Sequence, residues 1–297
     1  MNAVLESRGV GKRYRQRWAL ADCTLSIPAG RVVGLVGPNG AGKTTLLGLA
    51  AGILRPTAGS IEVLGGRPAS SPAQLARVGF VAQDTPVYGG LSVADHLKLG
   101  AKMNPGWDAC LAADRIGHLA LDRRQRAGKL SGGQRAQLAL TLAMAKRPEL
   151  LLLDEPVASL DPMARREFLE GLSEFIAGRP VSVVLSSHLV SDLERVCDYL
   201  IVLVSSRVQV AGQVSQLLAT HRRLTGTLPA PAGLPSGWDV ISAGRAGPHT
   251  VVVAKASTPV IHDPAWTVHE VSLEDLVLAY MSRATTPGTE HALEVDQ

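Results

Sequence analysis

The feature that most constrains this chain is the nine-residue segment GPNGAGKTT at positions 37–45. It matches the pattern G-x-x-x-x-G-K-[ST]. An apolar β-branched run at 32–36 precedes it, and residues 43–51 have helical spacing of apolar positions. In such a strand–loop–helix unit the glycines let successive backbone N–H groups point at phosphate oxygens, and the helix N-terminus adds positive potential. The motif therefore predicts an α/β fold with a P-loop for a polyphosphate ligand.

Within this loop, two side chains have distinct expected roles. Lys43 supplies a point charge to the β- and γ-phosphates, and the Thr44 hydroxyl is a hard oxygen ligand for Mg²⁺. The full set of expected phosphate-binding residues is Gly37, Pro38, Asn39, Gly40, Ala41, Gly42, Lys43, Thr44 and Thr45.

Two carboxylates follow a second apolar run, LLLL at 150–153. At the carboxyl end of a strand Asp154 can reach a metal beside the P-loop. Since side chains alternate along a strand, Glu155 is expected to point elsewhere, where it can polarise a water in line with the γ-phosphate. Without the P-loop, the same pair would read as an acidic turn.

Strands that alternate with helices predict a parallel sheet for the first part of the chain. Buried strands are expected at 32–36, 150–153, 181–186 and 199–204, with shorter strands elsewhere in residues 3–36 and at 60–64. Residues 84–147 read as a helical insert, with one helix capped by Ser92 and Asp95 and another at 134–146. We expect an ATPase-sized domain over 1–219.

The composition changes near residue 220, which predicts a C-terminal extension over 220–297. A Pro- and Gly-rich segment at 228–237 reads as a linker, and residues 250–254 as a strand. Ser272 opens a helix that runs to about Met281, and the last dozen residues form a polar tail. The extension is expected to be a small α+β unit.

Charge and cysteine usage limit the compartment and the ligand. The body before residue 220 is mildly basic, which suits a nucleotide, and its densest cluster is Lys12, Arg13, Arg15 and Arg17. That cluster reads as a solvated or ligand-rim surface, with a DNA-binding patch as the alternative, and no nucleic-acid partner is expected. Three scattered cysteines, no signal-type N-terminus and no membrane-length apolar run predict a cytoplasmic chain.

A second phosphate-shaped surface is expected at the sequence LSGGQ, residues 130–134, which precedes a helix. One γ-phosphate does not need two such cradles from the same subunit. The economical interpretation is that this one contacts a nucleotide held by another copy, through Ser131, Gly132, Gly133 and Gln134. A plain helix cap is the alternative.

Together, GPNGAGKTT, LSGGQ, LLLLDEP, SLD at 159–161 and the His of SSH at 186–188 strongly resemble the ATPase subunit of ABC transporters. The resemblance covers about residues 3–218. It implies a P-loop NTPase with an N-terminal antiparallel β-subdomain and a helical insert. It also implies that two copies meet head to tail with two ATP molecules between them, each with Mg²⁺.

The resemblance also assigns further residues. Gln83 would sense Mg²⁺ and contact the membrane partner, His188 would hold the γ-phosphate, and Asp161 would link the two sites. Tyr14 would stack on adenine, with Trp18 as a competitor for that role. Without the family, Gln83 reads as a loop residue and His188 as a capping or core histidine, while Asp161 can also cap the next helix.

Within the family, the first hypothesis is the ATP-hydrolysing subunit of a transporter. Its membrane-spanning permease would be a separate chain, and the subunit would lie peripherally on the inner face of the membrane. The alternative is a soluble ABC ATPase acting on DNA, ribosomes or iron–sulfur assembly. The short tail resembles that of drug- and antibiotic-exporter ATPases, so export is expected. Docking is expected around Gln83 and an apolar cluster of Pro86, Val87, Tyr88 and Leu91, unless these pack inside the insert.

Overall fold

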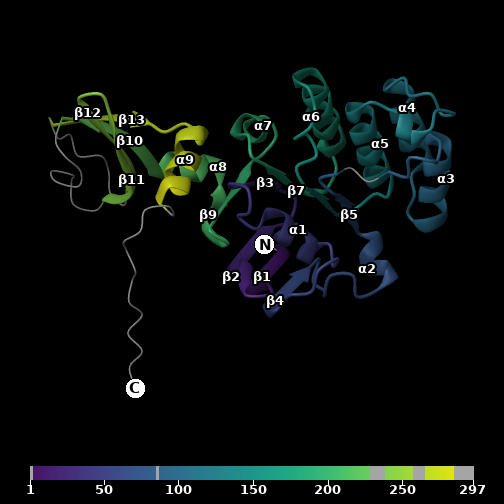
Figure 1. Ribbon diagram of the computed structural model, residues 1–297, viewed down its shortest axis with the longest axis horizontal. Coiled ribbons are helices and arrows are strands. Elements are labelled where there is room, and N and C mark those ends of the chain that lie inside the picture. The colour runs from purple at the N-terminus through teal and green to yellow at the C-terminus, as the bar shows by residue number, and fades with distance from the viewer. Residues whose placement is uncertain (1–2, 85–86, 228–237, 257–264, 284–297) are drawn as a thin grey trace. The chain divides into compact units, whose positions relative to one another are not determined.

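The computed structural model (Figure 1) describes residues 3–84, 87–227, 238–256 and 265–283. The chain divides into two compact units, residues 1–214 and 215–297. The composition had predicted the boundary after residue 219. The division by contacts falls five residues earlier, within α8 (Val214–Thr220), all of which except Val214 belongs to the second unit. The 228–237 segment and the polar tail lie outside the described residues.

A six-stranded sheet forms the centre of the first unit. Its spatial order is β5-β6-β7-β3-β8-β9, parallel from β5 to β8, with β9 antiparallel at the edge. The strands are β3 (Val32–Val36), β5 (Val78–Val81), β6 (Leu150–Leu153), β7 (Ser182–Ser187), β8 (Tyr199–Val204) and β9 (Arg207–Gln213). The inner strands are buried along their length, as their unbroken apolar sequences predict.

The register of this sheet positions the functional loops. Leu153 of β6 is level with Val81 of β5 and Leu185 of β7, and Val36 of β3 is level with Ser187. The segments that follow these strands therefore emerge at one edge, where ligands bind in open parallel sheets. The helices that the structure describes in this unit outside the helical insert are α1 (Lys43–Ala50), α2 (Pro72–Ala76), α6 (Pro162–Ile176) and α7 (Val190–Glu194), of which α2 contacts β5 and α7 contacts β7.

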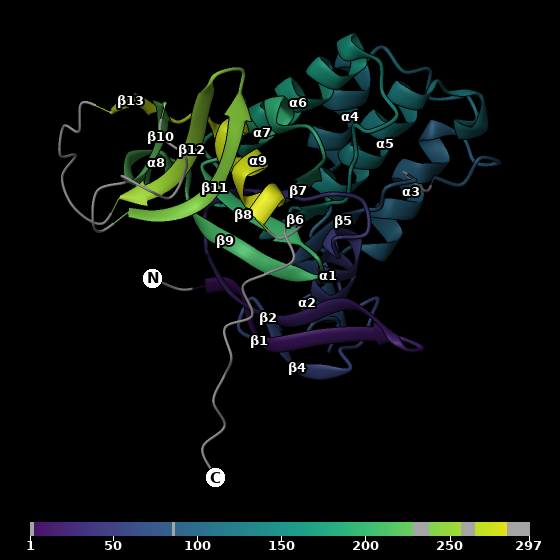
Figure 2. The same cartoon turned by 60° about the vertical axis from the view of Figure 1, so that its left-hand side comes forward.

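A separate antiparallel sheet, in the order β2-β1-β4, contributes to the same core (Figure 2). It comprises β1 (Ala3–Tyr14), β2 (Arg17–Pro28) and β4 (Ala58–Val63). The sequence predicted short strands here, whereas β1 and β2 are 12 residues each. Register shifts interrupt their pairing, so the alternation that marks a long strand is broken in the sequence.

The helical insert has its own apolar core, built from residues such as Val93, Ile116 and Leu138. Its elements are α3 (Val93–Met103), α4 (Ala109–His118), the short 3₁₀ helix η1 (Ala127–Lys129) and α5 (Gly132–Ala145). Ser92 and Asp95 form the capping box at the start of α3 that the sequence predicted. Figures 1 and 2 both show α3, α4 and α5 gathered beyond β5.

The second unit is a four-stranded antiparallel sheet, β11-β12-β10-β13, with α9 against β11 and β12. Its elements are β10 (His221–Gly226), β11 (Trp238–Ala246), β12 (His249–Ala256), β13 (Trp266–Glu270) and α9 (Leu273–Arg283). The buried His221 ring accepts a hydrogen bond from the Tyr280 hydroxyl at 2.9 Å and donates one to the Leu217 carbonyl at 2.7 Å. These bonds join α8, β10 and α9.

Candidate functional site

The loop between β3 and α1 depends on glycine at two positions. A Cβ on Gly37 would lie 2.1 Å from the Leu203 carbonyl oxygen, so only glycine lets the loop pass this close to β8. Gly42 has a φ of +108°, and a Cβ there would lie 2.5 Å from the Ala19 carbonyl oxygen. These constraints hold the loop in the conformation that a phosphate cradle requires.

Lys43 is the first residue of α1, yet its side chain folds back into the loop. Its Nζ donates to the Gly37 carbonyl at 2.7 Å and forms an ion pair with Glu155 Oε1 at 3.0 Å. Only 5% of the residue is exposed. A buried ammonium of this kind needs an anionic partner, and in this structure the partner is the carboxylate that follows β6.

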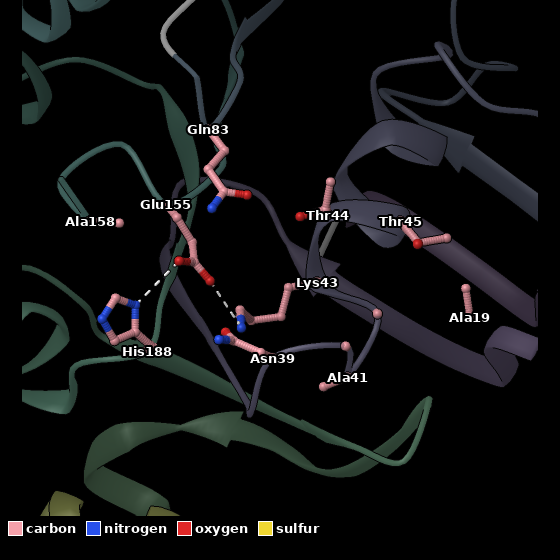
Figure 3. Close-up of a pocket in the computed structure, with 12 residues that line it drawn as sticks. Ala19, Asn39, Ala41, Lys43, Thr44, Thr45, Gln83, Glu155, Ala158 and His188 are labelled. Carbon is pink, nitrogen blue, oxygen red and sulfur yellow. Dashed lines mark hydrogen bonds and ion pairs between the residues drawn. The ribbon is translucent and has the colours of Figure 1, made fainter.

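The Glu155 carboxylate lies between a lysine and a histidine (Figure 3). One oxygen faces Lys43, and the other lies 3.2 Å from His188 Nδ1. Burial opposes its charge, but the hydrogen bond and charge of Lys43, together with His188, hold the pKa of Glu155 below its usual value. These contacts favour the ionised form of Glu155, which is the form that can accept a proton.

Asp154 is almost completely buried and points to different partners. Ser186 Oγ donates to Asp154 Oδ1 at 2.9 Å, and burial raises the pKa of Asp154 although the Thr44 and Ser186 hydroxyls act in the opposite direction. The sequence predicted that the two acids diverge through strand alternation. They do diverge, but β6 ends at Leu153, and Glu155 adopts a φ of 44°, an unfavourable value for a residue with a side chain.

Ser186 is a positioning residue that sequence reasoning missed. Besides bonding Asp154, its hydroxyl accepts the Glu155 backbone N–H at 2.8 Å, so one fully buried side chain fixes both acids. The available signal was a pair of polar residues, Ser186 and Ser187, at the end of an otherwise apolar strand.

A cavity of about 680 Å³ opens between these groups. Its lining includes Gln83, which follows β5, together with Glu155 and His188 (Figure 3). Seven of the expected phosphate-binding residues also line it: Asn39, Gly40, Ala41, Gly42, Lys43, Thr44 and Thr45. Three further predicted residues contact residues of this lining. The Gly37 and Pro38 carbonyls accept hydrogen bonds from Lys43, and Asp154 interacts with the Thr44 hydroxyl.

The LSGGQ segment does not contribute to this cavity's lining. Ser131 caps α5: its hydroxyl accepts the Gln134 N–H at 3.1 Å, and the Gln134 side chain accepts the Ser131 N–H at 3.0 Å. Gly132 and Gly133 form the first turn of the helix. Asp161 caps α6 by accepting the Met163 and Ala164 N–H groups, both at 3.0 Å. Ser131 and Asp161 are both exposed, and neither lines the cavity of its own copy.

Neither Tyr14 nor Trp18 lines the cavity, although Ala19 does. Both rings are partly exposed, at 46% and 40%, and each lies beside a cation: Lys12 is 5.3 Å from the Tyr14 ring centre and Arg13 is 5.5 Å from that of Trp18. Trp18 also packs over Gly11. Adenine stacking on Tyr14 stays a prediction.

Strand, loop and helix with a buried lysine and two carboxylates at the sheet edge define a P-loop nucleotide-binding protein. A family model described as ABC transporter matches residues 20–158. The phosphonates import ATP-binding protein PhnC 2 of Pseudomonas syringae pv. syringae (strain B728a) is 35% identical over 241 residues, covering 73% of this chain and 87% of that protein. The Nod factor export ATP-binding protein I of Cupriavidus pinatubonensis (strain JMP 134 / LMG 1197) is 34% identical over 225 residues, covering 73% and 69%.

Solved structures agree with this result. A structure described as the ATP-binding subunit of an ABC transporter has a TM-score of 0.65 and 26% identity, and the match covers 73% of this chain and 92% of that one. A dimeric ATP-binding cassette in a post-hydrolysis state with ADP and Pi has a TM-score of 0.64 and 21% identity, covering 71% and 98%. The latter likeness concerns the fold alone.

The chain belongs to the ABC transporter ATP-binding family. It is an ATP-binding and ATP-hydrolysing subunit of a transporter, as predicted, and these relatives support that function over a role with DNA, ribosomes or iron–sulfur assembly. Among the described residues, none of the helices is both long enough and apolar enough to cross a membrane.

The position of Glu155 gives a first prediction. Glu155→Gln keeps the shape and hydrogen bonding of the side chain but removes the charge that accepts a proton from water. ATP turnover should fall by about 100-fold or more, the usual contribution of a general base. Binding of a fluorescent ATP analogue should persist. Steady-state hydrolysis at the parental rate would show that Glu155 is not the base.

Proposed function

We propose that this subunit powers transport through a head-to-tail dimer that closes on ATP. ATP lies between the P-loop of one copy and residues 131–134 of the other. The observation that carries the proposal is the ionised Glu155 between Lys43 and His188, at the mouth of the P-loop cavity. A triphosphate entering the cavity offers Lys43 a stronger anionic partner. Glu155 is then free to polarise the attacking water, and His188 contacts the γ-phosphate.

The residues beside the loop suit Mg²⁺. Among the described residues, no group of three or more His, Cys, Asp or Glu side chains is able to hold a metal. Mg²⁺, however, commonly takes one or two carboxylates together with phosphate and water oxygens. Asp154 and the Thr44 hydroxyl interact directly, and a cation would offset the burial of the Asp154 charge. We propose that Thr44, Asp154 and Gln83 hold the ion, which would neutralise phosphate charge during hydrolysis.

Two observations support the shared site. Ser131, Gly132 and Gln134 are exposed and absent from the lining of their own copy's cavity, and the helix N-terminus there suits an anion. Asp161 is equally exposed at the start of α6. The partner we propose is a second copy of this chain, with Ser131, Gly132, Gly133 and Gln134 against its γ-phosphate.

The geometry of α5 selects the variant that tests this dimer. A Cβ on Gly133 would lie 2.9 Å from Ala164 Cβ, so substitution there disturbs the fold, whereas a Cβ on Gly132 meets nothing within 4 Å. An aspartate at Gly132 also suits the first turn of a helix. In the Glu155→Gln background, Gly132→Asp should weaken ATP-driven dimerisation at least about 10-fold more than the neutral Gly132→Asn, because the carboxylate meets the γ-phosphate.

Sedimentation in saturating ATP measures the two dimer affinities, and the fluorescent analogue checks that monomers still bind nucleotide. Equal dimerisation of the Asp and Asn variants would contradict the head-to-tail site.

We also propose that the subunit docks peripherally on a membrane-spanning chain through Gln83 and an apolar groove in the helical insert. The groove, of about 430 Å³, is lined by Tyr88, Gly89, Gly90, Leu91 and Leu99. The Tyr88 ring is exposed and stacks on the buried His96, whose Nε2 accepts the Tyr88 N–H at 3.0 Å. An apolar segment of the permease is its proposed occupant.

The sequence-based docking cluster needs one correction. Val87 is half-buried and packs against the core of the insert, because its side chain completes the apolar cluster around Val93 and Ile116. Pro86 lies outside the described residues. Tyr88 and Leu91 remain as candidate contacts.

Tyr88→Asp tests the groove. It should leave ATP binding and thermal melting of the isolated subunit unchanged, since the ring is 67% exposed. Co-purification with the membrane chain should fall at least about 10-fold, because an interface would bury an unpaired charge. Ile53→Asp, at an exposed aliphatic residue outside the insert, is the matched control and should co-purify fully. A Tyr88→Asp subunit that melts normally and still co-purifies would place docking elsewhere.

The direction of transport stays a prediction. We propose export, in the drug- and antibiotic-exporter branch, on the likeness of the short tail around Ser272–Tyr280 to that of exporter subunits. The relatives do not support this direction: import subunits for phosphonates, Fe(3+) ions and molybdenum outnumber the Nod factor export subunits among them. Identifying the co-purifying membrane chain is the test: a permease of importer type would overturn the proposal.

A further inference from the structure

Helices α5 and α6 contact each other at two levels. The LSGGQ segment lies at the start of α5, and Asp161 caps α6. At their N-terminal ends, Gly133 of α5 lies against Ala164 of α6, so closely that a Cβ on Gly133 would lie 2.9 Å from Ala164 Cβ. Further along, a side chain from a third helix, Arg115 of α4, bridges them. Figure 1 shows α5 between α4 and α6, and α5 contacts both helices.

The Arg115 guanidinium has acceptors on both helices. On α5, Nη2 donates to Gln137 Oε1 at 3.1 Å and Nε to Thr141 Oγ1 at 3.4 Å. On α6, Nη1 donates to the Gly171 carbonyl at 3.3 Å. The guanidinium lies directly over Gly171, since a Cβ there would be 3.0 and 3.2 Å from its two terminal nitrogens.

Arg115 is partly buried at this helix interface, and its three acceptors are uncharged. Burial lowers the pKa of Arg115, which the more distant charge of Glu174 only partly opposes. Apolar side chains of similar volume often replace buried charged groups with no loss of stability, so stability alone does not explain an arginine here. Unlike an apolar side chain, the planar guanidinium can donate directional hydrogen bonds to two helices at once.

We propose that Arg115 is a positioning residue that fixes α6 against α5. It thereby holds Asp161 and residues 131–134 in the relative geometry that the partner copy's nucleotide requires. The inference rests on the proposed head-to-tail dimer. Arg115 touches neither the P-loop cavity nor the LSGGQ segment, so its removal should affect dimer closure and leave nucleotide binding by the monomer intact.

The first test replaces the Arg115 side chain by an apolar side chain of similar length. In the Glu155→Gln background, Arg115→Met should bind the fluorescent ATP analogue within twofold of the parent, yet dimerise at least about 10-fold more weakly in ATP. With Glu155 intact, it should lower kcat while leaving the KM for ATP nearly unchanged. The matched control is Arg147→Met: Arg147 follows α5 and pairs with Asp108 at 2.7 Å, a contact confined to the insert. This control should dimerise like the parent.

The second test separates positioning from folding. Gly171→Ala adds a methyl group that displaces the guanidinium, a flexible side-chain end, while alanine stabilises a helix relative to glycine. The variant should melt no lower than the parent and still dimerise more weakly. In the Arg115→Met background the same change should have no further effect, because the contact it disturbs is already gone.

Failure of the Glu155→Gln parent itself to dimerise in ATP would overturn the proposed function, and this inference with it. If the parent dimerises, full dimerisation of both Arg115→Met and Gly171→Ala would overturn the role of Arg115 alone. So would independent, additive losses from the two substitutions. Should Arg115→Met fold poorly, Gly171→Ala decides: weaker dimerisation at undiminished melting temperature supports the role, and parental dimerisation contradicts it.

Discussion

The site depends on one buried contact, the ion pair between Lys43 and Glu155. Lys43 belongs to the P-loop and Glu155 to the end of β6, so the 3.0 Å contact joins two segments that are far apart in the sequence. The parallel register of β6, β7 and β3 brings those segments to one edge of the sheet. Each charge is the partner that makes burial of the other tolerable. We propose that the phosphates of a nucleotide compete with Glu155 for Lys43.

The chain also presents two helix N-termini suited to anions, with different surroundings. The one at α1 is enclosed by Gln83, Glu155 and His188, whereas the one at α5 is exposed and satisfied only by its own capping box. We propose that the enclosed cradle and the open one on the same chain are complementary halves of a site. This is the physical basis for proposing two copies rather than one, and for asking how α5 and α6 keep their mutual geometry.

Much of this arrangement could be predicted from the sequence because backbone chemistry dictates it. The P-loop needs glycine where Gly37 passes a carbonyl, and the inner strands need unbroken apolar runs. Long-range side-chain contacts could not be predicted in this way. The bond from Ser186 to both acids and the bridge from Arg115 to α6 join residues that only the folded chain brings together. The turn that separates Asp154 from Glu155 was likewise hidden, because the positive φ of Glu155 follows the end of the apolar run and leaves no mark in its pattern.

The central claim is that Lys43 provides the charge that binds the phosphates. Its most direct test is equilibrium binding of a fluorescent ATP analogue to Lys43→Ala, both alone and combined with Glu155→Gln. The combined variant removes the repulsion that an unpaired Glu155 would exert on the phosphates. Loss of a charge-assisted contact worth about 1.5–3 kcal/mol should weaken binding by roughly 10-fold or more in both variants. Parental affinity in both would contradict the account.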